Sequence, residues 1–117
     1  MAFNLLGYIL YKKKSSSSYK ELYMIQNFKN KLTHNIWLRK RTKLDASLQN
    51  QALKRLRILD AATCIGDLRF PPSNMFHALT GDRKGQYAIK VNQQYRICFK
   101  WNVDNNNAFD VEFVDYH

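Results

Sequence analysis

Hydrophobic residues repeat at helical spacing in the middle of the chain. Over residues 44–62 a single apolar stripe recurs at i, i+4 and i+8, which predicts an amphipathic helix. The stripe consists of Leu44, Leu48, Ala52, Leu53, Leu56 and Leu59. A shorter helical pattern precedes it at Leu32, Ile36 and Trp37, and residues 25–28, which are apolar at both ends, fit an edge strand.

The hydrophobic period changes from 3.6 to 2 after residue 74. Residues 67–74 include Pro71–Pro72, which excludes a helix interior and indicates a rigid, extended connector. Three segments then alternate apolar and polar side chains, at 86–91, 95–101 and 109–114, with hairpin loops at 92–94 and 104–107. The predicted fold class is α+β, with an N-terminal strand and helices packed on a small antiparallel sheet that contains a three-stranded meander.

The size and composition indicate one globular domain. The chain has 117 residues, of which 45% are hydrophobic and 14% aromatic, enough for a small core. Residues 1–23 differ from the rest, because an apolar start is followed by a basic triplet and four serines, the reverse of a secretory signal. We expect them to be a flexible extension or a wrongly assigned start, with 24–117 as the domain. A membrane-surface or partner-binding arm is the alternative.

The net charge suggests a polyanionic partner. Nineteen Lys and Arg against nine Asp and Glu give a formal charge of +10, which attracts nucleic acid, an anionic membrane or an acidic protein. No apolar run reaches the ~18–20 residues that a membrane span needs. Cys64 and Cys98 have no zinc-ligand spacing, and both are expected to be buried thiols of a reducing cytosol.

The C-terminal half is rich in side chains that can cleave RNA without a metal. Such cleavage needs proton transfer at the 2′-OH and at the leaving oxygen, and neutralisation of the charge on phosphorus, for which His, Tyr, Arg and Lys are suited. Candidates in this half include His77, Arg83, Lys84, Tyr87, Lys90, Tyr95, Arg96, Lys100, Tyr116 and His117. The strand pattern also fits a structural role in which Arg96 and Lys100 pair across strands with Glu112 or Asp110.

Three stretches together resemble a known family. They are residues 60–69, with Asp60-Ala61-Ala62-Thr63 and Asp67-Leu68-Arg69 before the two prolines; residues 79–99, from Leu79-Thr80-Gly81-Asp82 to Tyr95-Arg96-Ile97-Cys98-Phe99; and the ending Val111-Glu112-Phe113-Val114-Asp115-Tyr116-His117. In this order and spacing they resemble the HigB branch of the RelE-type toxins of type II toxin–antitoxin systems, over residues 24–117. The resemblance implies a RelE-like fold.

The resemblance also implies an activity and partners. It implies a ribosome-dependent endoribonuclease, an mRNA interferase that cuts messenger RNA by metal-free and cofactor-free acid–base chemistry and so inhibits translation in the cytoplasm. The implied partners are the 70S ribosome with its messenger RNA and a HigA-type helix-turn-helix antitoxin. Operator DNA would be contacted only through that antitoxin.

The resemblance assigns roles to individual residues. Arg96 would neutralise the scissile phosphate, Tyr116 and His117 would handle protons, and His77 would position substrate or stabilise charge. The residues expected to hold ribosomal or messenger phosphates are Arg83, Lys84, Lys90 and Arg69.

Two positions depart from the family pattern. Thr80 and Asn92 stand where other members carry Lys and Arg, so two cationic helpers are missing. We therefore expect a slower nuclease that depends more on Arg96, with Lys90 or Arg69 replacing the lost charge. A non-catalytic basic module that binds nucleic acid or ribosomes, or an attenuated toxin, is the alternative.

Overall fold

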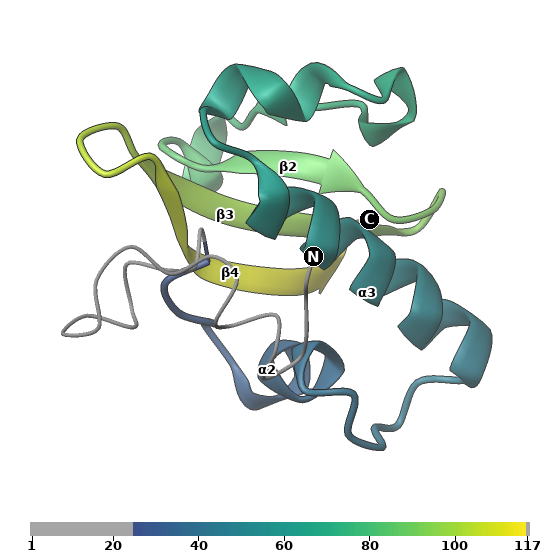
Figure 1. Cartoon of the computed structure of the whole chain (residues 1–117). Helices are drawn as coiled ribbons and strands as arrows, with labels where there is room; N and C mark the ends of the chain where they lie inside the picture. Colours follow the sequence, from purple (N-terminus) through teal and green to yellow (C-terminus); the bar gives the residue numbers. More distant parts are fainter. Residues whose placement is uncertain (1–24, 117) are drawn as a thin grey trace, which may run out of the picture.

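The computed structural model describes residues 25–116, and it confirms the α+β prediction (Figure 1). A four-stranded antiparallel sheet has the order β1-β2-β3-β4, and two helices accompany it. The elements are α2 (Lys31–Trp37), α3 (Ala46–Ala61), β1 (His77–Ala78), β2 (Tyr87–Lys90), β3 (Tyr95–Asn102) and β4 (Asn107–Asp115). The predicted extension at 1–23 and the C-terminal His117 lie outside the described residues. Among the described helices, none has the length and apolar character to cross a bilayer.

Helix α3 presents its apolar stripe to the sheet. The stripe members Ala52, Leu56 and Leu59 are fully buried, as the periodicity predicted. The helix begins at Ala46, two residues later than expected, because Asp45 is extended and its side chain accepts a hydrogen bond from the backbone N–H of Leu48 at 2.8 Å. Figure 1 shows α3 lying across one face of the sheet.

Helix α2 lies along the β4 edge of the sheet. The Asn30 side chain caps it by accepting the N–H of Thr33 at 2.9 Å. The buried hydroxyl of Thr33 in turn accepts the N–H of Phe113 in β4 at 2.9 Å, so α2 satisfies a donor of that strand. The predicted edge strand at 25–28 is reduced to two isolated parallel bridges, Ile25 with Ala108 and Phe28 with Val111.

The three predicted alternating segments form the meander β2-β3-β4. Aromatic side chains stack on the face that packs against the helices: Tyr87 on Phe99 at 6.0 Å between ring centroids, and Tyr95 on Phe113 at 4.8 Å. Both tyrosines pack against the main core, as their shared parity with apolar neighbours predicted. Strand β1 was not predicted, because its two residues are too few to show alternation.

The connector is not extended, contrary to the sequence prediction. It forms two short 3₁₀ turns, Ile65–Arg69 and Pro72–Asn74. Asp67 holds the start of the first turn by accepting the N–H and hydroxyl of Thr63 at 2.9 and 3.0 Å, and these bonds keep the pKa of its carboxyl below the usual value. Pro72 opens the second turn, where a missing N–H is not a loss. The two prolines thus set the starting point of the second turn, and Asp67 holds the first.

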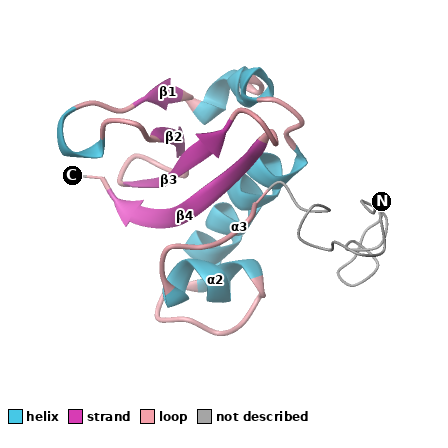
Figure 2. Cartoon of the chain, turned by 90° about the vertical axis from the view of Figure 1, so that its left-hand side faces the viewer, coloured by secondary structure: helices cyan, strands magenta, loops and turns pink. Residues whose placement is uncertain are grey.

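The sheet has two different faces. The helices cover one of them, and Figure 2 shows both helices on the same side of the strands. On the opposite face, called here the outer face, Leu79, Ala88 and Cys98 form a second small buried cluster with Val114 packed against it. The loop 79–86 contributes Leu79 to this cluster. Beyond the cluster, where Lys90 lies opposite Arg96, the outer face carries polar side chains.

Candidate catalytic site

The strand register brings the main candidates to one end of the outer face. Lys90 of β2, Arg96 of β3 and Val114 of β4 are direct neighbours across the sheet. Tyr116 follows Val114 by two residues and so has the same parity. His77 pairs with Ala88, which also belongs to the outer face. Four residues separated by up to 39 positions in sequence therefore share one face.

Arg96 is held over the ring of Tyr116. Its guanidinium carbon lies 5.1 Å from the ring centroid, a cation–π distance. Nη1 donates to the carbonyls of Tyr95, at 3.0 Å, and Asn92. Nε is buried and has no partner among the described residues. A buried unpaired donor costs about 1–3 kcal/mol, and a guanidinium N–H is suited to donate to an anion.

His77 faces the hydroxyl of Tyr116. The Nδ1 of His77 lies 2.8 Å from the carbonyl oxygen of Met75, which only accepts, so Nδ1 carries the proton of the neutral ring. Nε2 is then the acceptor, and it lies 3.5 Å from the Tyr116 oxygen, the outer limit of a hydrogen bond. The two rings meet edge to face at 6.3 Å. The histidine is therefore oriented to take or return the phenol proton.

Lys90 gives this end of the sheet a second cation. It lies directly opposite Arg96 in the β2–β3 register. Like charges opposite each other on neighbouring strands destabilise a sheet, unless an anion lies between or beside them. Lys90, Arg96, Tyr116 and His77 together offer two positive charges, a phenol and an imidazole. This combination suits the binding of a phosphate and the transfer of protons around it.

The remaining predicted residues lie elsewhere. Arg83 donates to Glu112 at 3.3 Å and to Gln86 at 3.0 Å on the outer face, so its guanidinium is already engaged. Lys84 is exposed and follows the 3₁₀ turn Gly81–Arg83. Arg69 lies over the Phe76 ring at 5.6 Å, apart from Arg96, because Phe76 stacks on Tyr87 on the helix side of the sheet. Their proposed contacts with RNA stay predictions.

The alternative prediction, that Arg96 and Lys100 form ion pairs across strands, is correct for Lys100 and wrong for Arg96. Lys100 pairs with Asp110 at 3.6 Å, as that alternative expected. Arg96 does not pair with Glu112, because Arg83 and Lys29 occupy that carboxylate at 3.3 and 3.9 Å. Arg96 instead turns toward the hairpin carbonyls and Tyr116.

Asn92 has a role in the site that the sequence analysis missed. Its side-chain oxygen accepts the N–H groups of Gln94 and Tyr95 at 2.9 and 2.8 Å and so closes the β2–β3 hairpin. Its carbonyl anchors Arg96. An Asn at the start of a hairpin loop is a known signal for this kind of turn. Asn92 therefore has a structural role of its own, although it stands where other family members carry an arginine. It positions Arg96.

The two thiols are expected to differ in reactivity. Cys64 is exposed, contrary to the expectation of burial, whereas Cys98 is fully buried. Burial raises the pKa of the Cys98 thiol to about 11, against a weaker opposing effect of Arg83. At pH 8 we expect one fast alkylation by iodoacetamide, lost in Cys64→Ser, and a second only after unfolding. Fast labelling of the one remaining thiol, Cys98, in the folded Cys64→Ser protein would contradict the burial.

The same pKa predicts a loss of stability in alkali. A thiol whose pKa is higher in the folded than in the unfolded chain binds its proton more tightly when folded. The contribution of the protonated Cys98 thiol to the free energy of unfolding is complete below the ordinary thiol pKa near 9.0. It is lost as the pH rises toward the folded-state pKa of about 11. Urea midpoints at pH 8 and pH 10.5 should therefore differ less in Cys98→Ala than in the parent.

This geometry defines a class of protein: a small basic α+β domain that gathers two cations, a phenol and an imidazole on the outer face of its sheet. Comparison with known proteins then identifies the family. Residues 17–117 match the family described as the RelE-like toxin HigB of type II toxin–antitoxin systems, and the chain belongs to this family. The match begins within the predicted extension, so the domain boundary at residue 24 stays a prediction.

Individual relatives are consistent with this assignment. The chain is 47% identical to "Toxin HigB-1" of Vibrio cholerae over 58 residues, which is 50% of this chain and 61% of the relative. It is 38% identical to "Endoribonuclease HigB" of Proteus vulgaris over 63 residues, 54% of this chain and 65% of the relative. An uncharacterized protein of Haemophilus influenzae is 32% identical over 76 residues, 65% of this chain and 72% of the relative. The chain thus spans just under two thirds of the two named toxins.

Proposed function

We propose that this protein is a toxin that cuts messenger RNA on the ribosome, with Arg96, Tyr116 and His77 at the reacting phosphate. The observation that carries the proposal is the placement of the Arg96 guanidinium 5.1 Å from the Tyr116 ring while His77 Nε2 lies 3.5 Å from the Tyr116 hydroxyl. The Proteus relative is named an endoribonuclease, and its similarity supports the same chemistry here.

The reaction balances as a transesterification within the RNA. The 2′-OH loses its proton and its oxygen bonds to phosphorus, while the bond from phosphorus to the 5′ oxygen breaks and that oxygen gains a proton. The products are a 2′,3′-cyclic phosphate and a 5′-hydroxyl. Arg96 stabilises the charge on the phosphorane, with Lys90 beside it. Two protons move in this reaction, one from the 2′-OH and one to the 5′ oxygen. The pair of Tyr116 and His77 handles one of these transfers, and His117 is the proposed donor or acceptor for the other.

The proposed partners follow from the family and the charge. The ribosome supplies the messenger RNA, and the net charge of +10 favours its approach to a polyanion of that size. A HigA-type helix-turn-helix antitoxin would hold the toxin inactive and contact operator DNA on behalf of the complex. Both partners operate in the cytoplasm, which is the expected location of this toxin.

The activity is tested with the full chain, translating ribosomes and one defined message. We expect discrete breaks near the A site, whose upstream fragments end in a cyclic phosphate and therefore accept a tail only after enzymatic removal of that phosphate. Naked message should stay intact. Fragments with free 3′-hydroxyl ends would contradict the transesterification, and binding to ribosomes without any break would favour the non-catalytic alternative.

The role of the phenol is tested by Tyr116→Phe. Loss of the hydroxyl should lower the cleavage rate by about 100-fold, in the range of general acid–base contributions, with little change in the ribosome concentration needed for half-saturation. Tyr87→Phe is the matched control, since this ring packs on the helix side of the sheet. Equal rates for both variants would remove Tyr116 from the proposed chemistry.

A further inference from the structure

A basic groove lies on the helix side of the molecule, away from the candidate site. It encloses about 780 Å³ between α3 and the loop that joins α2 to α3. Four of its ten lining residues are cations and none is acidic: Arg39, Lys40, Arg41 and Arg57. Within residues 25–116 no acid lies within ion-pair distance of these four. A concave surface with this charge is suited to an anion.

The loop places an arginine where the backbone favours glycine. Arg39 follows the end of α2 in the left-handed conformation, with φ of 62°. Its N–H donates to the Ile36 carbonyl at 3.1 Å and that of Lys40 to Asn35 at 2.9 Å, the pattern of a helix end that glycine usually completes. The backbone conformation alone disfavours a bulky residue at this position. The arginine side chain is therefore expected to serve a function outside the helix end.

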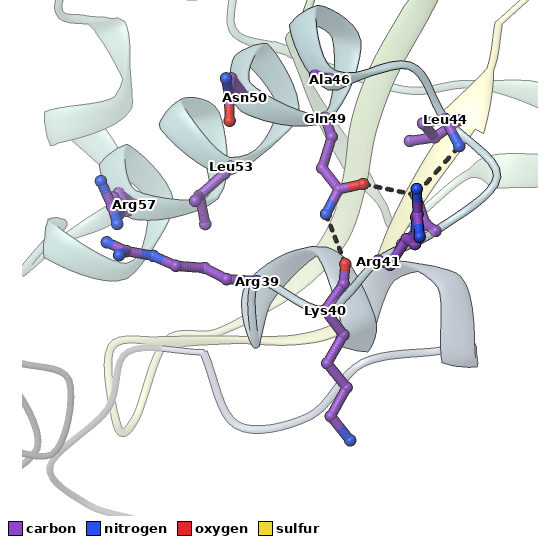
Figure 3. Close-up of a pocket in the computed structure, with 10 residues that line it drawn as sticks. Arg39, Lys40, Arg41, Leu44, Ala46, Gln49, Asn50, Leu53 and Arg57 are labelled. Atoms are coloured by element: carbon purple, nitrogen blue, oxygen red, sulfur yellow. Dashed lines mark hydrogen bonds between the residues drawn. The ribbon is translucent and has the colours of Figure 1, made fainter.

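Gln49 of α3 fixes the loop against the helix. Its side-chain N–H donates to the Lys40 carbonyl at 2.7 Å, and its oxygen accepts the Thr42 hydroxyl at 2.6 Å. Thr42 in turn accepts the N–H of Leu44 at 3.1 Å. Figure 3 shows the Gln49 amide spanning from α3 to the loop. The groove is therefore preorganised by one side chain, which lowers the cost of ordering it around a ligand.

Two guanidinium groups converge in this groove. Arg39, from the loop, and Arg57, from α3, both line the groove, and Figure 3 shows the Arg39 side chain extending toward Arg57, whereas the ammonium of Lys40 points away. Like charges that converge without an acid repel each other until an anion bridges them. Arginine forks match the oxygens of a phosphate, and each can donate two hydrogen bonds to it.

We propose that Arg39 and Arg57 clamp a backbone phosphate of RNA. A protein partner would need exposed apolar anchors, yet the two leucines that line the groove, Leu44 and Leu53, are half-buried against the core. The most exposed large hydrophobic side chains, Phe70, Met75 and Val103, lie outside it. The candidate site is on the outer face of the sheet and the groove on the helix side, so the clamped phosphate belongs to a different part of the RNA. This proposal rests on the proposed function, because the ribosome would supply the structured RNA that carries the clamped phosphate.

Binding is measured with the full chain and a fluorescent RNA hairpin made of 2′-O-methyl nucleotides, which no 2′-OH attack can cut. We expect Arg57→Gln and Arg39→Gly each to weaken binding about five- to tenfold at 100 mM salt and to lower the slope of log affinity against log salt by about 1. Lys31→Gln, which removes one exposed charge outside the groove, is the matched control and should lower affinity less than twofold.

Arg39→Gly separates recognition from folding. Glycine fits the left-handed position, so the melting temperature should stay or rise while RNA affinity falls. If both groove variants bind the hairpin as Lys31→Gln does, the clamp is wrong. Stronger effects of the groove variants on binding of a polyglutamate peptide than on the hairpin would also overturn it, in favour of an acidic protein partner.

Cleavage on ribosomes distinguishes this proposal from the proposed function. If the parent cuts messages and the groove variants cut them with unchanged half-saturation, the clamp fails and the nuclease stands. If hairpin binding depends on Arg39 and Arg57 but the parent never cuts, the clamp stands and the nuclease fails.

Discussion

Arg96→Ala is expected to lower ribosome-dependent cleavage by about 100- to 1000-fold, the range found when a group that stabilises charge in a transition state is removed. The change removes the cation over Tyr116 and the side-chain donor to the Asn92 carbonyl, whereas the Tyr95 carbonyl still accepts the backbone N–H groups of Val91 and Asn92. Lys90 remains as a single point charge and cannot replace a bidentate fork. Single-turnover cleavage on saturating ribosomes measures the effect on the chemical step.

Arg96→Lys is the informative comparison. It keeps one charge but loses the planar fork and the stacking on Tyr116, so its rate should lie between those of the parent and Arg96→Ala. Lys100→Ala, which removes a cation paired with Asp110 on the same strand, should cut within threefold of the parent. Circular dichroism and melting curves check that each variant is folded. Cleavage by a folded Arg96→Ala at the parental rate would make the phosphate assignment untenable.

Much of the fold was predictable because burial imposes a period on the sequence. The stripe of α3 and the alternation in β2, β3 and β4 both report which side chains face the core, and both were confirmed. The connector was mistaken because prolines exclude a helix interior without selecting among the remaining shapes, and a short 3₁₀ turn accepts proline at its first position. Strand β1 left no pattern in two residues.

The candidate site was predictable in its members and less so in its geometry. Strand parity and the family resemblance together place Arg96 and Tyr116 on one face. The bond from His77 to the Met75 carbonyl, which fixes the imidazole tautomer, depends on a turn conformation that no side-chain pattern encodes. The Arg39–Arg57 convergence was also hidden, since it depends on how a loop folds back on α3. Contacts of backbone carbonyls and of loops are set by tertiary structure.

The largest effect on stability is expected from Asn74→Ala. Asn74 is fully buried in the connector, where its amide donates to the carbonyls of Leu68 and Phe70 at 3.0 and 3.1 Å. Its oxygen accepts from Arg55 of α3 at 2.6 Å. Alanine would leave two carbonyls and a guanidinium without this partner, which should lower the free energy of unfolding by about 3 kcal/mol. For a domain of this size the melting temperature should fall by roughly 10–20 °C.

Two further variants separate the bonds that Asn74 makes. Ser73→Ala removes only an exposed contact with Arg55 at 3.4 Å and should change the free energy of unfolding by less than about 0.5 kcal/mol. Asn74→Asp keeps the acceptor for Arg55 but loses both donors, so its loss should approach that of alanine if the carbonyls of Leu68 and Phe70 dominate. Urea unfolding of the three variants decides this. A stable Asn74→Asp protein would show that the link to α3, rather than the closing of the turns, holds the connector in place. Because Met75 follows directly and orients His77, cleavage by the folded fraction of Asn74→Ala should fall as well.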